Sequence, residues 1–217
     1  MITALGHAAP DVKWLALIGG SGSDRANAVA VDSAGNAYIT GSISGTNVMF
    51  GDHLASNSGD RMCVAKFDRK GSNVWVSTVG GTQTEGRGIA VDEDGNVYAS
   101  GSVWAGGATT NSFGNTNLTG IGGSAFLAKL NDQGEFQWVR RVSSSAGVSS
   151  LQLATSLTIM GTNLYLAGQC HNYADFGTTV LTNAAMFLAV YDLDGNLTAA
   201  HRLAEPVVPG GIPWQVA

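Results

Sequence analysis

Two pairs of neighbouring charged residues are the first candidates for chemistry in this 217-residue sequence. Asp24 stands beside Arg25, and Glu85 lies two residues before Arg87. A carboxylate and a guanidinium held together can bind a polar ligand through paired, charge-assisted hydrogen bonds. Exposed neighbours of opposite charge also form local ion pairs that add little stability. Two interpretations follow, a polar ligand-binding ring or ion pairs within surface loops.

Trp104, His53 and His171 are the other candidates. An exposed tryptophan can stack on a sugar ring, although packing on its own loop would account for it equally well. None of the four histidines has metal-ligand spacing to another, so we interpret His53 and His171 as polar surface residues of long loops. The candidate ligand-binding residues are therefore Asp24, Arg25, Glu85, Arg87, Trp104, His53 and His171.

The segments 92–96 and 192–196, DEDGN and DLDGN, resemble the start of a calcium-binding loop. Such a loop needs further oxygen ligands and a distal bidentate glutamate, and Ser100 and Ala200 follow instead. We therefore predict tight turns and no metal site. The sequence also contains neither a nucleophile elbow nor a phosphate-binding loop, so we expect no cofactor and no enzyme activity.

The composition excludes several classes of protein. Charged residues make up 12% of the chain, glycines number 30 and the net charge is −5, which argues against nucleic-acid binding. No stretch is long and apolar enough to span a membrane, and the first residues lack the pattern of a signal peptide. Cys63 and Cys170 are too few for a disulfide framework, so we expect both to be small buried hydrophobes.

A repeat of about sixty residues, present three times, organises the chain. The segment 30–42, AVDSAGNAYITGS, returns at 90–102 as AVDEDGNVYASGS. Three other features return at the same spacing: Trp14, Trp75 and Trp138; the Phe-Gly pairs at 50–51, 113–114 and 176–177; and Gly71, Gly134 and Gly195. The third unit is more divergent, since Ala199 stands where the tryptophan is expected.

Each unit reads as four short strands joined by tight turns. In the second unit the strands are 87–92, 97–103, 125–131 and 136–142, and Asp, Gly and Asn supply the turns between them. A long polar loop separates the second strand from the third, and its repeated Phe and Leu predict a small satellite core under the loop.

Four antiparallel strands at fixed spacing are typical of a β-propeller blade. The shared pattern A-V-D-x-x-G-N-x-Y-x-x-G, followed by A-K-[FL]-[DN]-x-x-G and a tryptophan, resembles the bacterial seven-bladed β-propeller (SBBP) repeat family from residue 14 to about 203. The resemblance implies an all-β propeller from an extracellular or cell-surface bacterial protein. A parallel β-helix is the alternative, although its rungs are usually much shorter.

The predicted blades span about 24–80, 85–143 and 147–204, and 205–217 is expected to start a further blade. In a propeller the first strand of each blade lines the central channel and the fourth lies outermost, so residues 14–18 should form the outermost strand of another blade. Three blades are too few for a closed ring. We expect further blades, from a longer parent chain or from other chains, to complete it.

The expected function is that of a non-catalytic secreted or cell-surface scaffold that binds protein or polysaccharide through its long-loop face. The alternatives are a carbohydrate-binding propeller with one site per blade and, less favoured, a polysaccharide lyase or hydrolase. An enzyme would need acid and base groups on the channel-lining strands, and these strands offer almost none. We expect no nucleic-acid partner and no membrane span.

Overall fold

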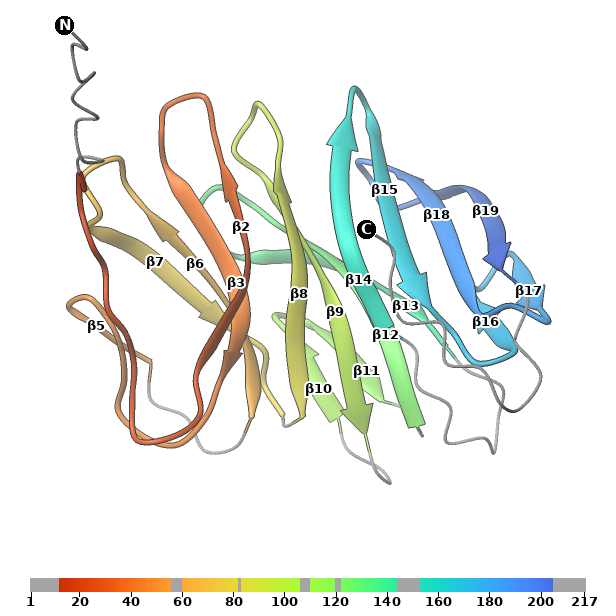
Figure 1. Cartoon of the computed structure of the whole chain (residues 1–217), viewed down its shortest axis with the longest axis horizontal. Coiled ribbons are helices and arrows are strands. Elements are labelled where there is room, and N and C mark those ends of the chain that lie inside the picture. The colour runs from red at the N-terminus through yellow and green to blue at the C-terminus, as the bar shows by residue number, and fades with distance from the viewer. Residues whose placement is uncertain are drawn as a thin grey trace, which may run out of the picture.

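The computed structural model describes residues 12–55, 60–81, 83–105, 110–119, 122–143 and 153–204, and its regular elements are all β-strands. Three four-stranded antiparallel sheets follow one another along the chain (Figure 1). The first contains β2 (Arg25–Val31), β3 (Ala37–Ile43), β6 (Arg61–Phe67) and β7 (Asn73–Thr78). The second contains β8 (Thr84–Val91), β9 (Val97–Ala105), β12 (Gly122–Leu130) and β13 (Phe136–Val142). The third contains β14 (Leu153–Met160), β15 (Asn163–Gln169), β18 (Met186–Asp192) and β19 (Leu197–Ala204).

In each sheet the strands pair in the order in which they occur in the chain. The first strands β2, β8 and β14 lie side by side (Figure 1), and β8 packs against both of the others. The described sheets form an open array rather than a closed barrel. The prediction of an all-β propeller segment of three four-stranded blades is confirmed, whereas residues 205–217 lie outside the described residues.

Hydrogen bonds from aspartate side chains hold the tight turns. In the first sheet, the backbone N–H of Asn36 donates to Asp32 Oδ1 (2.9 Å), and Asn36 Nδ2 and the Tyr38 hydroxyl donate to Asp32 Oδ2 (2.7 and 3.0 Å). Asp92, Asn96 and Tyr98 repeat this arrangement in the second sheet. Gly35 has φ +82°, which an L-residue adopts only with strain. The repeated Asp, Gly, Asn and Tyr are thus one structural unit.

A β-bulge interrupts each first strand at the same phase. The extra residue is Asn27 in β2, Arg87 in β8 and Thr155 in β14. The bulge brings a carbonyl close to the facing glycine of the second strand, so that a Cβ on Gly41 or Gly101 would overlap the carbonyl oxygen of Arg25 or Glu85. The last glycine of the repeated pattern is therefore required by the bulge.

The three long loops fold into β-hairpins, of which the second and third lie between neighbouring sheets, while the first packs on the first sheet and pairs with β1. Their strands are β4 (Val48–Phe50) with β5 (His53–Ala55), β10 (Thr110–Phe113) with β11 (Thr116–Thr119), and β16 (Tyr173–Asp175) with β17 (Val180–Thr182). Phe50, Phe113 and Phe176 are buried. Phe113 and Phe176 lie in the clusters between sheets, and Phe50 lies in the cluster on the first sheet. The satellite-core prediction is wrong, because each phenylalanine belongs to a main cluster of the sheets rather than to a separate core under its loop.

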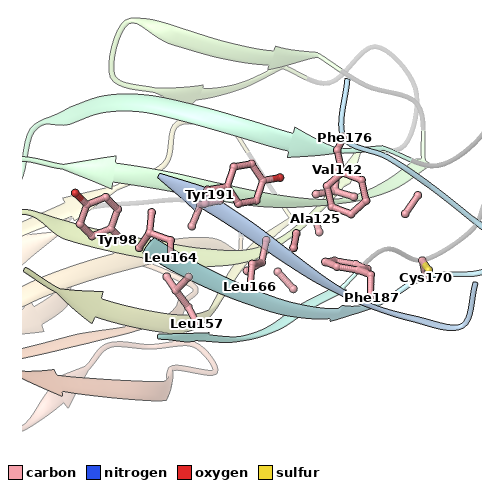
Figure 2. Close-up of a cluster of buried hydrophobic side chains, with 14 of the residues drawn as sticks. Tyr98, Ala125, Val142, Leu157, Leu164, Leu166, Cys170, Phe176, Phe187 and Tyr191 are labelled. Atoms are coloured by element: carbon pink, nitrogen blue, oxygen red, sulfur yellow. The ribbon is translucent and has the colours of Figure 1, made fainter. Parts of the chain in front are cut away.

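Figure 2 shows the cluster between the second and third sheets. Tyr98, Ala125 and Val142 belong to the second sheet and meet a larger group from the third. That group includes Leu157, Leu164, Leu166, Cys170, Phe176, Phe187 and Tyr191. An equivalent cluster joins the first and second sheets around Tyr38, Val64, Ile89 and Phe126. The second sheet, which lies between the other two, is thus apolar on both faces.

A tryptophan from one sheet lies over a glycine turn of the next. The Trp75 ring lies against Gly134, and its Nε1–H donates to the Asp132 carbonyl (2.9 Å). Trp138 lies against Gly195 in the same way. Both tryptophans pack on the clusters but are only half-buried. A tryptophan repeated at constant phase predicts a ring largely buried between blades, and this prediction is too strong, because each ring covers the outer rim of the junction.

Residues 14–18 do not form the expected regular strand, since only Ile18–Gly19 (β1) is a strand and it pairs with β4. The reason is physical, because a strand needs a hydrogen-bonded neighbour and the described residues provide none beside 14–17.

Replacing Gly101 by Ala should lower the free energy of unfolding by about 2–3 kcal/mol, because the new methyl group overpacks the bulge. Gly161→Ala is the control, since a Cβ there meets nothing within 4 Å and only the positive φ is strained, at about 1–2 kcal/mol. Urea denaturation measures both. An effect at Gly101 no larger than at Gly161 would contradict the bulge assignment.

Candidate functional site

The beginnings of the first strands and the ends of the second strands meet at one end of the sheets, which we call the variable end. It carries six of the seven candidate residues. Strand pairing fixes their equivalence, because Arg25 faces Ser42 and Glu85 faces Ser102. The equivalent sets are Arg25, Glu85 and Leu153; Asn27, Arg87 and Thr155; and Ser44, Trp104 and His171.

Asp24 and Arg25 are not the counterpart of Glu85 and Arg87. Asp24 holds the loop before β2 against the end of β3. Its Oδ2 accepts a hydrogen bond from the Gly20 N–H (2.8 Å), and its Oδ1 accepts one from the Ser44 N–H (3.0 Å). Among the described residues, no ion pair joins Asp24 to Arg25. The predicted pair is replaced by a loop-fixing aspartate and an exposed arginine.

Glu85 and Arg87 do form an ion pair, and it includes a partner from the neighbouring sheet. Arg87 Nη2 donates to Glu85 Oε2 at 2.8 Å, with 34% and 22% of the two side chains exposed. Asn27 Nδ2 donates to Glu85 Oε1 (2.9 Å) and to the Gly86 carbonyl (2.8 Å). The bulge residues of the first two sheets thus link β2 to β8 at the inner edge.

Sequence reasoning missed Asn27. Its signal was present, because aligning Ala30 with Ala90 places Asn27 opposite Arg87. The charged neighbours Asp24 and Arg25 suggested a different alignment of the two units. The bulge, which no residue pattern specifies, decides between them.

Trp104 lies on a strand, near the end of β9, with 45% of its surface exposed. Its backbone N–H donates to the Gln83 carbonyl (2.7 Å). It shares a sheet face with Ser102 and Tyr98, toward the third sheet. Glu85 pairs with Ser102, and its carboxylate accepts a hydrogen bond from Asn27 of the first sheet. Among the described residues, no hydrogen bond or ion pair joins Trp104 to Glu85 or Arg87.

The two histidines lie apart from each other. His171 is exposed at the variable end, between β15 and β16. His53 is exposed at the first residue of β5, directly after the hairpin turn in which Gly51 lies beside Asn73 at the start of β7. His53 is therefore at the outer rim, away from the other candidates. No group of three potential metal ligands gathers within the described ranges.

The cysteines are buried, as expected. Burial raises the pKa of Cys63 to about 12 and that of Cys170 to about 11. Both thiols therefore stay protonated near neutral pH, and their sulfur atoms are poor nucleophiles.

The turn aspartates are the groups whose charge matters to the fold. Partial burial tends to raise the pKa of Asp32, but hydrogen bonds from Asn36 and Tyr38 outweigh it and leave the pKa below its ordinary value. Hydrogen bonds from Asn196 lower the pKa of Asp192, and those from the backbone of Ser72 and Lys70 lower the pKa of Asp68. The ionised carboxylate is the form that these turns bind.

The sheet order, the bulges and the tryptophan-on-glycine contacts define a propeller-type repeat protein. Residues 13–47 and 74–105 match the family model for the SBBP beta-propeller repeat, so these two segments are similar to repeats of that family. No curated protein matches the chain. Across the part of the chain that the structure describes, no helix is long and apolar enough to cross a membrane.

Acidification should destabilise the fold through these turns. Because the pKa values of Asp32, Asp68 and Asp192 are lower in the folded state than the ordinary aspartate value of 3.8, the stability that these carboxylates contribute is complete above that value and is lost as the pH falls through the folded pKa. Thermal melts at pH 7 and then stepwise below pH 4 measure this. Asp32→Asn should show a weaker dependence than the wild type, and an identical dependence would contradict the assignment.

Calcium and EDTA should leave the melting temperature unchanged. Both carboxylate oxygens of Asp32 already accept hydrogen bonds within the turn, and a cation would have to displace these donors. Differential scanning calorimetry with each additive measures the effect. A rise of several degrees with calcium would overturn our interpretation of the turns.

Proposed function

We propose that the chain is a non-catalytic propeller scaffold of a secreted or cell-surface bacterial protein, and that its variable end binds a protein or a polysaccharide. The proposal rests on one observation, which is that the first two sheets share residues at the tight-turn end, whereas the three sheets differ at the variable end. At the tight-turn end, Asp32 and Asp92 have the same role, as do Tyr38 and Tyr98. At the variable end, equivalent positions carry side chains of different chemistry.

Ser44, Trp104 and His171 occupy one equivalent position, and the last two are exposed. The fold tolerates three different residues here, so packing does not dictate their chemistry. Side chains that differ from sheet to sheet suit a ligand that contacts several sheets at once. This supports a macromolecule over a small ligand bound once per sheet.

A carbohydrate-binding propeller with one site per blade is less well supported. Such a site needs an exposed aromatic at the same phase of every unit. The aromatics repeated in the long loops are Phe50, Phe113 and Phe176, and all three are buried. Trp104 is the exposed aromatic of the variable end, and it belongs to the second sheet alone.

A structural role for the repeated acids also supports a scaffold over a lyase or hydrolase. The Asp32 and Asp92 carboxylates accept hydrogen bonds within their turns, and Glu85 is bonded by Asn27 and Arg87. These groups hold the fold, which leaves them poorly placed to exchange protons with a substrate.

The test is a binding screen on glycan and protein arrays with two matched charge-reversal variants. Arg25→Glu with His171→Glu changes the variable end, and Arg69→Glu with Lys70→Glu changes the exposed turn between β6 and β7. We expect binding by the wild type and the turn variant, and a loss of at least about tenfold in affinity in the variable-end variant. No ligand, equal loss in both variants, or cleavage of a bound polysaccharide would overturn the proposal.

A further inference from the structure

Segment Val12–Gly19 packs against the first sheet in the way in which the fourth strand of a preceding sheet would. The Trp14 ring stacks on Phe67 (centroids 6.3 Å apart, planes at 19°) and lies over Gly71. Trp75 lies over Gly134 and Trp138 over Gly195 in the same way. Trp75 and Trp138 each belong to the fourth strand of one sheet and pack on the next sheet. Trp14 packs on the first sheet in the same way, although it belongs to no described sheet.

The backbone pairing at the end of this segment repeats as well. Gly19 pairs with Met49 of the first hairpin. Gly80 pairs with Ser112 of the second hairpin, and Ser143 with Asp175 of the third. Segment Val12–Gly19 is therefore bound to the first sheet at both ends, as the fourth strand of a preceding sheet would be.

One side of the segment is covered and the other is open. Ala16 and Ile18 pack on the cluster of the first sheet, whereas Leu15 and Leu17 are 81% and 79% exposed. Val139 is equivalent to Leu15 and is 6% exposed, because it packs in the cluster that the first and second sheets share. The exposed leucines thus mark a face that a cluster of this kind would cover.

The inner part of the same surface is also open. Val29 of β2 is 65% exposed, whereas its equivalents Ile89 and Leu157 are 6% and 7% exposed. Ile89 and Leu157 are covered by the sheet that precedes them. The position thus requires the first strand of another sheet beside β2.

We propose that this surface binds a three-stranded antiparallel sheet of the same repeat type, to which segment Val12–Gly19 contributes the fourth strand. The third strand of that sheet pairs with residues 14–17, in the register that joins Lys66 to Trp75 and Val64 to Ser77. Its first strand covers Val29 and Val31. The pairing satisfies the backbone groups of the segment and buries Leu15 and Leu17.

A second copy of the chain does not fit this surface. The third sheet already has its own fourth strand, β19, which would occupy the same place as segment Val12–Gly19. The third sheet also lacks the side chains that stabilise the other junctions. Its Val190 is equivalent to Lys66 and Lys129, which lie over tyrosine rings, and its Ala199 is equivalent to the tryptophans.

The test adds such a sheet to the chain. Residues 84–135 fused directly before Val12, in place of residues 1–11, supply three strands and leave segment Val12–Gly19 as the fourth. The matched control fuses residues 84–143, which carry their own fourth strand, through a flexible linker. Hydrogen exchange of the Leu15 and Leu17 amides, followed by mass spectrometry, is the readout.

We expect exchange at Leu15 and Leu17 to slow by at least about tenfold in the first fusion relative to the unfused chain, and not in the control. Trp14→Ala in the first fusion should reverse the effect, because it removes the anchor over Gly71. Equal exchange in both fusions would overturn the proposal. Protection in the unfused chain that rises with protein concentration would also overturn it, in favour of a second copy.

Discussion

A four-stranded sheet that lies between two others must cover two apolar faces. In the second sheet Ile89 faces the first sheet and Tyr98 faces the third, and both are almost fully buried. A sheet with two apolar faces gains stability from a neighbour on each side, so the sheets stack in chain order. The hairpins and the half-buried tryptophans serve the same need, because they fill the outer part of each junction. The exposure of Val29, Leu15 and Leu17 shows what happens where no neighbour lies.

The bulge couples this stacking to the variable end. It inserts one residue into each first strand, and in two sheets that residue reaches a polar partner at the inner edge. The carbonyl displaced by the bulge requires a glycine opposite, at Gly41 and Gly101. The bulge therefore explains why a glycine is repeated at this position. It also explains why Asn27 and Arg87, which are not repeated, reach polar partners at the inner edge. Neither the glycine nor the bulge residue could change position without the other, because the bulge fixes both.

Sequence patterns predicted the parts of the fold that local chemistry determines. Asp32, Gly35, Asn36 and Tyr38 lie close together in the chain and interact with one another, so the turn follows from the residues alone. The hairpin phenylalanines were identified as buried but assigned to the wrong core. For Phe113 and Phe176 the cluster includes the neighbouring sheet, which is distant in sequence. The link between Asn27 and Glu85 was missed for a similar reason, since it spans 58 residues and depends on a bulge. Long-range registers of this kind are set by packing between sheets and leave no local pattern.

The division between repeated and non-repeated positions separates folding from recognition within one chain. At the tight-turn end, Tyr38 and Tyr98 each donate a hydrogen bond to an aspartate and lie under a lysine. A change in one of these residues would leave the others without their partner. At the variable end, Ser44, Trp104 and His171 replace one another without a shared partner among the described residues. Positions free of mutual dependence can adapt to a ligand sheet by sheet while the junctions stay intact. A scaffold built in this way presents a composite surface, whose specificity comes from the combination of sheets rather than from a pocket repeated in each.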